Sequence, residues 1–179
     1  MARGAGVKIT KLAIFALALL GVPALAQAAI SESDLQIAAR ALSFMANPPT
    51  GTVRVGIVFD PSNPQSAADA TQLRQLMANG LRVGNLTLQP VPVPISDASS
   101  AQVGFFFLTE GAGAAARLGD IAKAKQVACI TVDLAQVRAG ACAIGVRSAP
   151  RIEILVNQAA AQGSGVTFST AFRMLITEF

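Results

Sequence analysis

The protein has 179 residues, of which 53% are hydrophobic and 13% are charged, and its mean hydropathy is +0.53. This composition excludes a disordered chain, and the length predicts a single domain. The sequence contains no histidine, which excludes a Ser-His-Asp triad, a Cys-His pair and a His-ligated zinc site. We therefore expect no enzyme, no bound metal and no cofactor, and a protein that acts by binding.

The first 26 residues have the layout of a secretory signal peptide. Three basic residues precede an apolar run from Leu12 to Leu20, and Ala24-Leu25-Ala26 is a small-x-small cleavage signature. The run is too short to cross a bilayer, for which a helix needs about 20 apolar residues. A cut two or three residues later and a retained anchor are the alternatives. We expect residues 1–26 to be removed and residues 27–179 to form one domain in a bacterial periplasm.

The charge of the exported chain is nearly balanced. Three of the 14 Lys and Arg residues and none of the 10 Asp and Glu residues fall in the leader, which leaves a net charge of +1. The remaining basic residues are scattered and form no run. Nucleic-acid binding needs a basic patch or stripe, so the sequence predicts no nucleic-acid partner.

The two cysteines are Cys129 and Cys142. An oxidising compartment permits a disulfide between them. Two buried thiols are the alternative, because a sequence does not give the Cα separation on which a bridge depends.

Helices and strands alternate along the first two thirds of the exported chain. Helical spacing of apolar residues predicts helices over 31–46, 66–79 and 114–125, the second of which starts with a capping-box-like pair of Ser66 and Asp69. Apolar runs predict strands over 53–59, 86–93, 103–108 and 127–132. Pro90 and Pro92 place the second strand at an edge or make it end early. The alternation predicts a three-layer, Rossmann-like α/β domain with a mostly parallel sheet.

The pattern changes after the last of these strands. Residues 141–146 and 151–156 are joined by Arg147-Ser148-Ala149-Pro150, a spacing that predicts an antiparallel hairpin at one edge of the sheet. A short helix follows through Gln162, with Asn157 as its cap. Ser169 is predicted to cap a last helix that carries Phe172, Leu175 and Ile176.

Ligands of open α/β sheets bind outside the carboxyl ends of the strands. Three such ends carry polar or glycine residues, and the candidate binding residues there are Asp60 and Ser62, then Glu110, Gly111 and Gly113, then Asp133. If the strands are neighbours, these residues share one edge of the sheet.

Two chemistries are open to this edge. The glycine-rich loop precedes a helix and could bind an anion, but Glu110 would repel a phosphate, and a structural turn is the alternative. Asp60, Glu110 and Asp133 could form a carboxylate cluster for a cation or for acid–base work. Acidic residues at strand ends are also common caps and turn formers.

Four short segments in the last third carry a family resemblance. They are Ala128-Cys129-Ile130-Thr131-Val132-Asp133, Gly140-Ala141-Cys142-Ala143-Ile144-Gly145, the strand 151–157 that leads into Ala159-Ala160, and 166–175 with its Ser turn and Leu-rich helix. In this order they resemble the YfiR-like family of bacterial periplasmic proteins, and the layout of residues 31–179 fits as well.

The resemblance implies a compact Rossmann-like domain with a regulatory role. It implies docking on the periplasmic sensor domain of an inner-membrane signalling protein such as a diguanylate cyclase, and so a part in c-di-GMP signalling. It also implies a capacity to form homodimers and disulfide-dependent stability. The alternative function is a small-molecule-binding single lobe related to the solute receptors of transporters, which would hold its ligand at the same strand ends.

Overall fold

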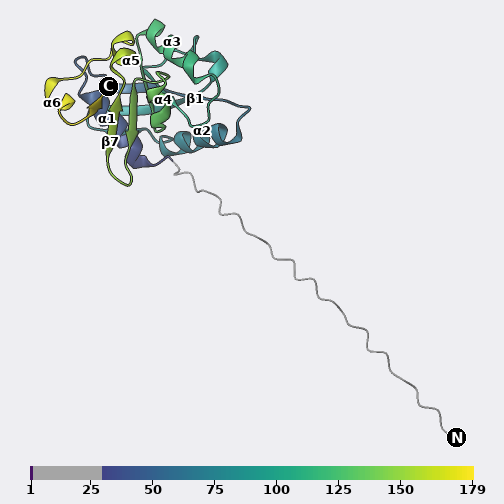
Figure 1. The fold of residues 1–179 in the computed structure, drawn as a ribbon. Helices are drawn as coiled ribbons and strands as arrows, with labels where there is room; N and C mark the ends of the chain where they lie inside the picture. Colours follow the sequence, from purple (N-terminus) through teal and green to yellow (C-terminus); the bar gives the residue numbers. More distant parts are fainter. Residues whose placement is uncertain (2–29) are drawn as a thin grey trace.

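A computed structural model of the chain describes Met1 and residues 30–179 (Figure 1). Apart from Met1, the predicted signal peptide, residues 1–26, lies outside the described residues. Within the described part, no helix has the length and apolar character needed to cross a membrane.

Helices and strands alternate through most of the described chain. The elements are α1 (Glu32–Ser43), β1 (Gly51–Phe59), α2 (Pro64–Leu76), β2 (Leu81–Val83), β3 (Leu86–Pro94), the 3₁₀ turn η1 (Ile95–Asp97), β4 (Phe105–Leu108), α3 (Ala115–Lys125), β5 (Ala128–Thr131), α4 (Leu134–Arg138), β6 (Ile144–Arg147), β7 (Glu153–Val156), α5 (Gln158–Gly163), α6 (Thr170–Arg173) and β8 (Thr177–Glu178).

The strands form one sheet in the order β2-β3-β1-β4-β5-β6-β7-β8. The five strands from β3 to β6 in this order are parallel to their neighbours, whereas β2 runs antiparallel to β3 and β7 antiparallel to β6. The predicted mostly parallel α/β sheet is confirmed.

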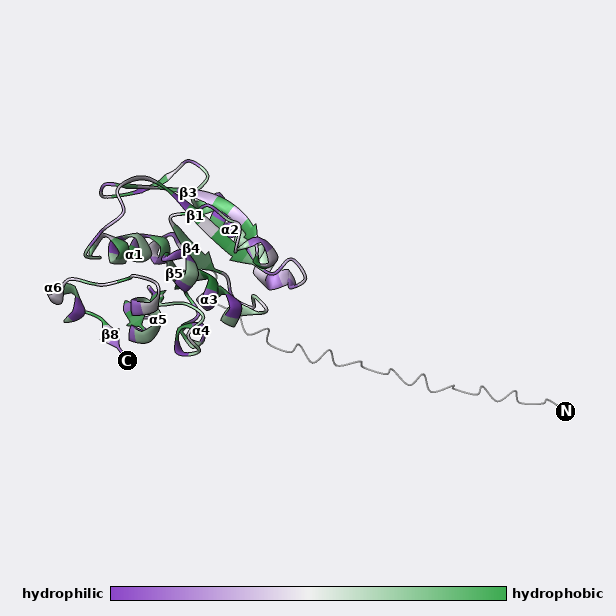
Figure 2. Ribbon diagram, turned by 90° about the horizontal axis from the view of Figure 1, so that it is seen from above, coloured by the Kyte–Doolittle hydropathy of each residue, from purple (hydrophilic) through white to green (hydrophobic). Residues whose placement is uncertain are grey.

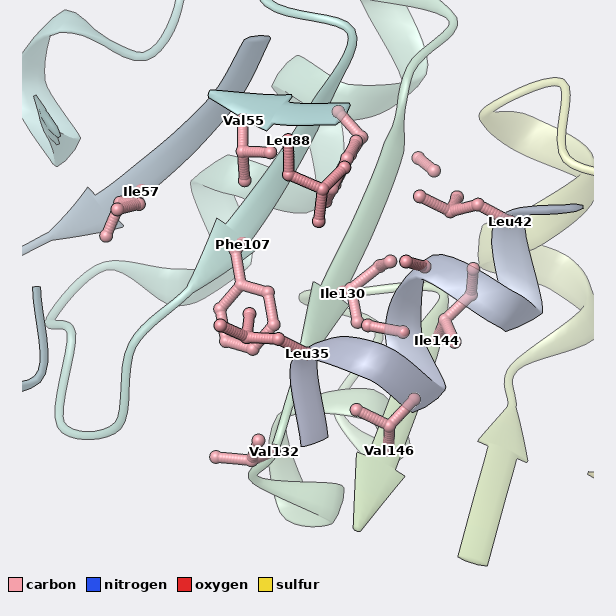
Figure 3. Packing of buried hydrophobic residues seen from close by; sticks show 14 of the residues in the cluster. Leu35, Leu42, Val55, Ile57, Leu88, Phe107, Ile130, Val132, Ile144 and Val146 are labelled. Carbon is pink, nitrogen blue, oxygen red and sulfur yellow. The ribbon is translucent and has the colours of Figure 1, made fainter. Parts of the chain in front are cut away.

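Helices cover both faces of this sheet (Figure 2). On one face, Leu35 and Leu42 of α1 lie over Phe107, Ile130 and Ile144 of the central strands (Figure 3). Leu73 of α2 belongs to the same cluster. On the other face, α3 packs on β4 and β5, and α4 packs beside it on β5, β6 and β7. The three-layer architecture is therefore confirmed.

Strand β4 supplies side chains to both layers of the core. Phe105 and Phe107 belong to the cluster under α1 and α2, whereas Phe106 and Leu108 belong to the cluster under α3. Successive side chains of a strand point to opposite faces, so a continuous apolar run suits a strand that is covered twice. Full burial of one such side chain contributes about 1.5–3 kcal/mol.

The prolines of β3 lie where its outer side has no paired strand. On that side β2 pairs only with Leu86 to Leu88, and Pro90 and Pro92 follow beyond the last paired residue. On its inner side β3 pairs with β1 along its full length. Because proline has no N–H, it is tolerated on an unpaired edge. The strand does not end early, and the prediction of an edge position holds for the part beyond Leu88.

The predicted start of α2 was wrong by two residues. The cap is Asn63, whose Oδ1 accepts hydrogen bonds from the N–H groups of Gln65 and Ser66 at 2.9 and 3.2 Å. Pro64 occupies the first turn, where its fixed φ favours the helix and its missing N–H costs nothing. Ser66 and Asp69 are therefore inside the helix, on its buried side.

The C-terminal region differs from the prediction in its last elements. The antiparallel β6–β7 hairpin is confirmed, and its connection contains a cis Ala149–Pro150 peptide bond. The predicted final helix was wrong beyond Arg173, because the chain turns there and β8 pairs in parallel with β7. Pairing with β8 satisfies backbone groups that the outer edge of β7 would otherwise expose.

The two cysteines form a disulfide. Cys129 lies in β5 and Cys142 lies in the segment before β6, with their Cα atoms 4.7 Å apart. This separation falls inside the range of about 4.4–6.8 Å that a bridge allows. Of the two alternatives, the bridge is confirmed and the pair of free thiols is not.

Candidate functional site

The connections of the sheet create a switch point between β1 and β4. From β1 the chain passes through α2 and β2 to β3, which pairs with one side of β1, and it then crosses to β4, which pairs with the other side. In open α/β sheets, the loops that diverge at such a point border the usual ligand crevice. The carboxyl end of the sheet therefore becomes the candidate site.

The loops after β1 and β4 are tied together by side chains. Asn63 donates from Nδ2 to the carbonyl oxygen of Gly111 at 2.9 Å. A chain of hydrogen bonds runs from the Asp60 N–H to Ser66 Oγ (2.9 Å) and from there to Thr109 Oγ1 (2.7 Å). The structure thus brings together two of the three predicted strand ends, which are 50 residues apart in sequence.

Asp60 lies in front of the glycine-rich loop. Its Oδ1 accepts hydrogen bonds from the N–H and the hydroxyl of Ser62 at 2.9 and 2.6 Å. These bonds, with a smaller contribution from the Gly113 N–H, hold the pKa of Asp60 below its ordinary value. A Cβ atom on Gly113 would come 2.6 Å from Asp60 Oδ2, so the loop approaches this carboxylate closely. The place of an incoming anion is therefore taken by the protein's own carboxylate.

A second acidic group lies behind the loop. Asp69, which is only 3% exposed, accepts hydrogen bonds from the Glu110 N–H at 3.2 Å and from Gln65 Nε2 at 2.8 Å. Burial raises the pKa of Asp69. Burial and the charges of Asp69 and Asp133 raise the pKa of Glu110, and the charge of Arg147 opposes this shift. The three acids therefore lie close enough to sense one another.

Asp133 caps a helix that the sequence did not predict. Its Oδ1 accepts a hydrogen bond from the Ala135 N–H at 2.8 Å, at the start of α4. Next to it, Gln136 donates to the Thr109 carbonyl oxygen at 3.1 Å and accepts from the Thr131 hydroxyl at 2.6 Å. This bridge joins the ends of β4 and β5, so all three predicted strand ends share one connected edge.

Two residues of this edge were missed as site residues: Asp69 and Gln136. Ser66, Asp69 and Leu73 recur at helical spacing, and all three are buried. Polar residues on the apolar stripe of a helix are the one signal that could have identified Asp69. Gln136 gave no local signal, because its partners come from other elements. Thr109 directly follows the Phe-rich strand, so its place at a strand end could be predicted, but its hydrogen bond to Ser66 could not.

The exposed and half-exposed residues at the three strand ends form an acidic rim. We use "acidic rim" for Asp60, Glu110 and Asp133 together with the exposed residues Ser62, Gly111 and Gly113. In residues 30–179, no three acidic or cysteine side chains are placed so that they could hold a metal ion, which leaves the cation-cluster interpretation without support from the geometry. Pockets of about 570, 190 and 110 Å³ lie elsewhere, and none of the six rim residues lines them.

Comparison with known proteins shows a shared fold. No family model and no curated protein matches this chain. Among solved structures, the chain is similar to a substrate-binding protein with adhesive properties from Clostridium difficile, in its ligand-free, open form, with a TM-score of 0.57 and 12% sequence identity. The match covers 83% of this chain and 59% of that protein, so this chain corresponds to about three fifths of its length.

Proposed function

We propose that this protein is an exported binding protein that docks through its acidic rim on the periplasmic domain of an inner-membrane signalling protein, such as a diguanylate cyclase. The observation that carries the proposal is the rim itself, where loops from three strands converge and expose polar groups. The YfiR-like segments of the sequence support a regulatory role and a place in c-di-GMP signalling.

Two features support export. The first 26 residues have the layout of a signal peptide. The buried Cys129–Cys142 disulfide is typical of proteins that fold in an oxidising compartment such as the periplasm.

The open form of the rim favours a protein partner. A pocket for a small molecule usually covers 70–90% of its ligand, and none of the three pockets described above is lined by rim residues. A protein surface can cover the whole rim at once. Because Asp60 is held ionised by Ser62 and is half-exposed, the complementary surface should carry Arg or Lys side chains. Such charge pairs speed association and make it sensitive to salt.

A second candidate function is the binding of a small molecule at the same edge. The likeness to a substrate-binding protein favours it. Proteins of that kind close two lobes around the ligand, whereas residues 30–179 form one sheet with two helix layers. An opposing wall would come from outside these residues, and a second copy of the chain is one source of it.

The decisive experiment combines capture and genetics. The tagged protein should recover a membrane signalling protein from detergent-solubilised membranes, and its deletion should change the cellular c-di-GMP level. Glu110→Gln should weaken binding of the recovered periplasmic domain about tenfold, as expected for loss of a close charge pair. Asp120→Asn is the matched control, because Asp120 is exposed on α3, away from the rim.

Two results would contradict docking on a signalling protein. One is the absence of any signalling protein among the captured membrane proteins together with an unchanged c-di-GMP level. The other is a metabolite that raises the melting temperature of the protein and loses this effect in Glu110→Gln, which would favour the small-molecule candidate.

A further inference from the structure

A groove lies at the opposite end of the sheet, near the start of β1. It has a volume of about 570 Å³ and is formed by α1, residues 48–50 and the turn between β2 and β3. Its charged side chains are Arg40 and Arg82, and we call it the arginine groove. None of its lining residues belongs to the acidic rim.

The fold fixes both walls of the arginine groove. Gln36, Arg40 and Ser43 are exposed and follow one another at spacings of four and three residues, so they form one stripe along α1. Helix α1 contacts β2 directly. The opposite wall is held by the Gly51 N–H, which donates to the carbonyl oxygen of Asn85 at 2.9 Å.

Part of the groove lining is apolar. Leu86 is 2% exposed, and Val83 packs against the main core from a half-buried position. Pro48 and Pro49 complete the apolar lining. The groove therefore offers apolar surface beside two cationic side chains.

The two guanidinium groups have no partner within residues 30–179. Neither Arg40 nor Arg82 makes a side-chain hydrogen bond or an ion pair there, and no acidic residue lines the groove. On the same helix, Glu32 lies about two turns before Arg40 and accepts a hydrogen bond from Gln36 Nε2 at 3.0 Å. The guanidinium donors, which match carboxylate and phosphate geometry, are thus left for a ligand.

We propose that the arginine groove binds a small anionic ligand, with a carboxylate or phosphate group held by Arg40 and Arg82 and an apolar body against the prolines and Val83. The volume lies inside the range of about 300–1,000 Å³ that is usual for small-molecule sites. The arginine groove would bind anions, whereas the acidic rim repels them. The proposal does not depend on the docking function of the rim.

The test uses three probes that share one apolar body: 2-naphthyl phosphate, 2-naphthoate and the neutral 2-naphthol. We expect one or both anionic probes to bind the purified protein in calorimetric titration and to raise its melting temperature, and the neutral probe to do neither. The stronger of the two anions identifies the head group as phosphate or carboxylate. Binding should weaken as salt is added, because the site is open to solvent.

Variants then locate the site. Arg40→Gln and Arg82→Gln should each weaken binding of the anionic probe about tenfold, the effect expected for one hydrogen-bonded charge contact. Arg117→Gln is the matched control, since Arg117 is exposed on α3, on the other face of the sheet. All three positions are exposed, so melting curves without probe should show that the variants fold.

Either of two outcomes would overturn the proposal. One is that neither anionic probe binds at millimolar concentration. The other is that an anionic probe binds equally well to the Arg40→Gln and Arg82→Gln variants and to the Arg117→Gln control.

Discussion

The two ends of the sheet carry opposite charges, and they differ in whether the charged side chains are hydrogen-bonded within the protein. At the carboxyl end, the acids accept hydrogen bonds from neighbouring loops and helices, as Asp60 does from Ser62 and Asp69 from Glu110. At the amino end, Arg40 and Arg82 make no such bonds within the described chain. The comparison indicates that the hydrogen-bonded acids at the carboxyl end contribute to stability, whereas Arg40 and Arg82 make no bond in the described chain through which they would do so.

The largest expected effect comes from the disulfide, which closes the segment that carries Asp133 and Gln136. The double variant Cys129→Ala/Cys142→Ala should lose about 3 kcal/mol of unfolding free energy, mainly because the unfolded chain regains the freedom of that loop. Urea denaturation measures the loss, and reduction of the wild type should reproduce it. Hydrogen exchange through local opening should accelerate in α4 and its flanking loops at the carboxyl end and stay unchanged in the arginine groove. Equal acceleration of this exchange at both ends would contradict a stabilisation confined to the carboxyl end.

The next effect tests the hydrogen-bond chain at the switch point. Thr109→Val should cost about 2 kcal/mol, because the buried Ser66 hydroxyl loses its acceptor. Thr52→Val is the control at the amino end of β1, where the side chain is exposed and the change should stay within about 0.5 kcal/mol. Denaturant midpoints measure both changes. An unchanged unfolding free energy in Thr109→Val would show that these hydrogen bonds do not stabilise the carboxyl end.

Two buried acids at the carboxyl end, Asp34 and Asp69, have pKa shifts of opposite direction, and the expected effects on stability are smaller. Asp34 accepts hydrogen bonds from the Ser31 N–H and hydroxyl and from the Ser148 N–H. Burial raises the pKa of Asp34, but these bonds outweigh it and leave the pKa below its ordinary value of 3.8. The pKa of Asp69 is raised, because burial outweighs its hydrogen bonds.

These opposite shifts predict opposite pH dependence. The ionised form of Asp34 stabilises the fold above pH 3.8, and this contribution is lost as pH falls through the lowered pKa. Asp34→Asn should therefore cost about 1 kcal/mol of unfolding free energy at neutral pH and little in strong acid.

For Asp69, the unfolding free energy of the wild type should fall as pH rises through the raised pKa, and Asp69→Asn should remove this dependence on pH. The unfolding free energy of each variant, measured against pH, tests both predictions. The same pH dependence in the two variants would contradict the opposite pKa shifts of Asp34 and Asp69.

The smallest expected effect concerns the two arginines of the arginine groove. Without ligand, Arg40→Gln and Arg82→Gln should each change the unfolding free energy by less than about 0.5 kcal/mol, because both side chains are exposed and unpaired in the described structure. Thermal or urea unfolding without probe measures this. A loss above 1 kcal/mol would mean that these arginines support the fold.

Much of the fold could be read from local patterns. The run Phe105-Phe106-Phe107-Leu108 identified a strand buried on both faces, and the prolines of β3 identified an unpaired edge. The three predicted strand ends proved to share one edge of the sheet. These features depend on side-chain alternation and on backbone chemistry, which act within a few residues.

Other features depended on distant partners. Ser66 looked like a cap in the sequence, but Pro64 moves the helix start and places Ser66 against Thr109, 43 residues away. The segment after Arg173 kept a helical pattern, but it pairs with β7 as β8. In both places tertiary contacts override local preference.

The sequence by itself determined the alternation of buried strands and amphipathic helices, and with it the layered α/β sheet, because burial patterns repeat every two or 3.6 residues along the chain. Only the tertiary structure decided that the cysteines are bridged, which polar groups of the carboxyl end hydrogen-bond to one another, and that two arginines from α1 and β2 face one groove. Each of those outcomes needs residues that are far apart in the chain to meet, and no local pattern specifies such a meeting.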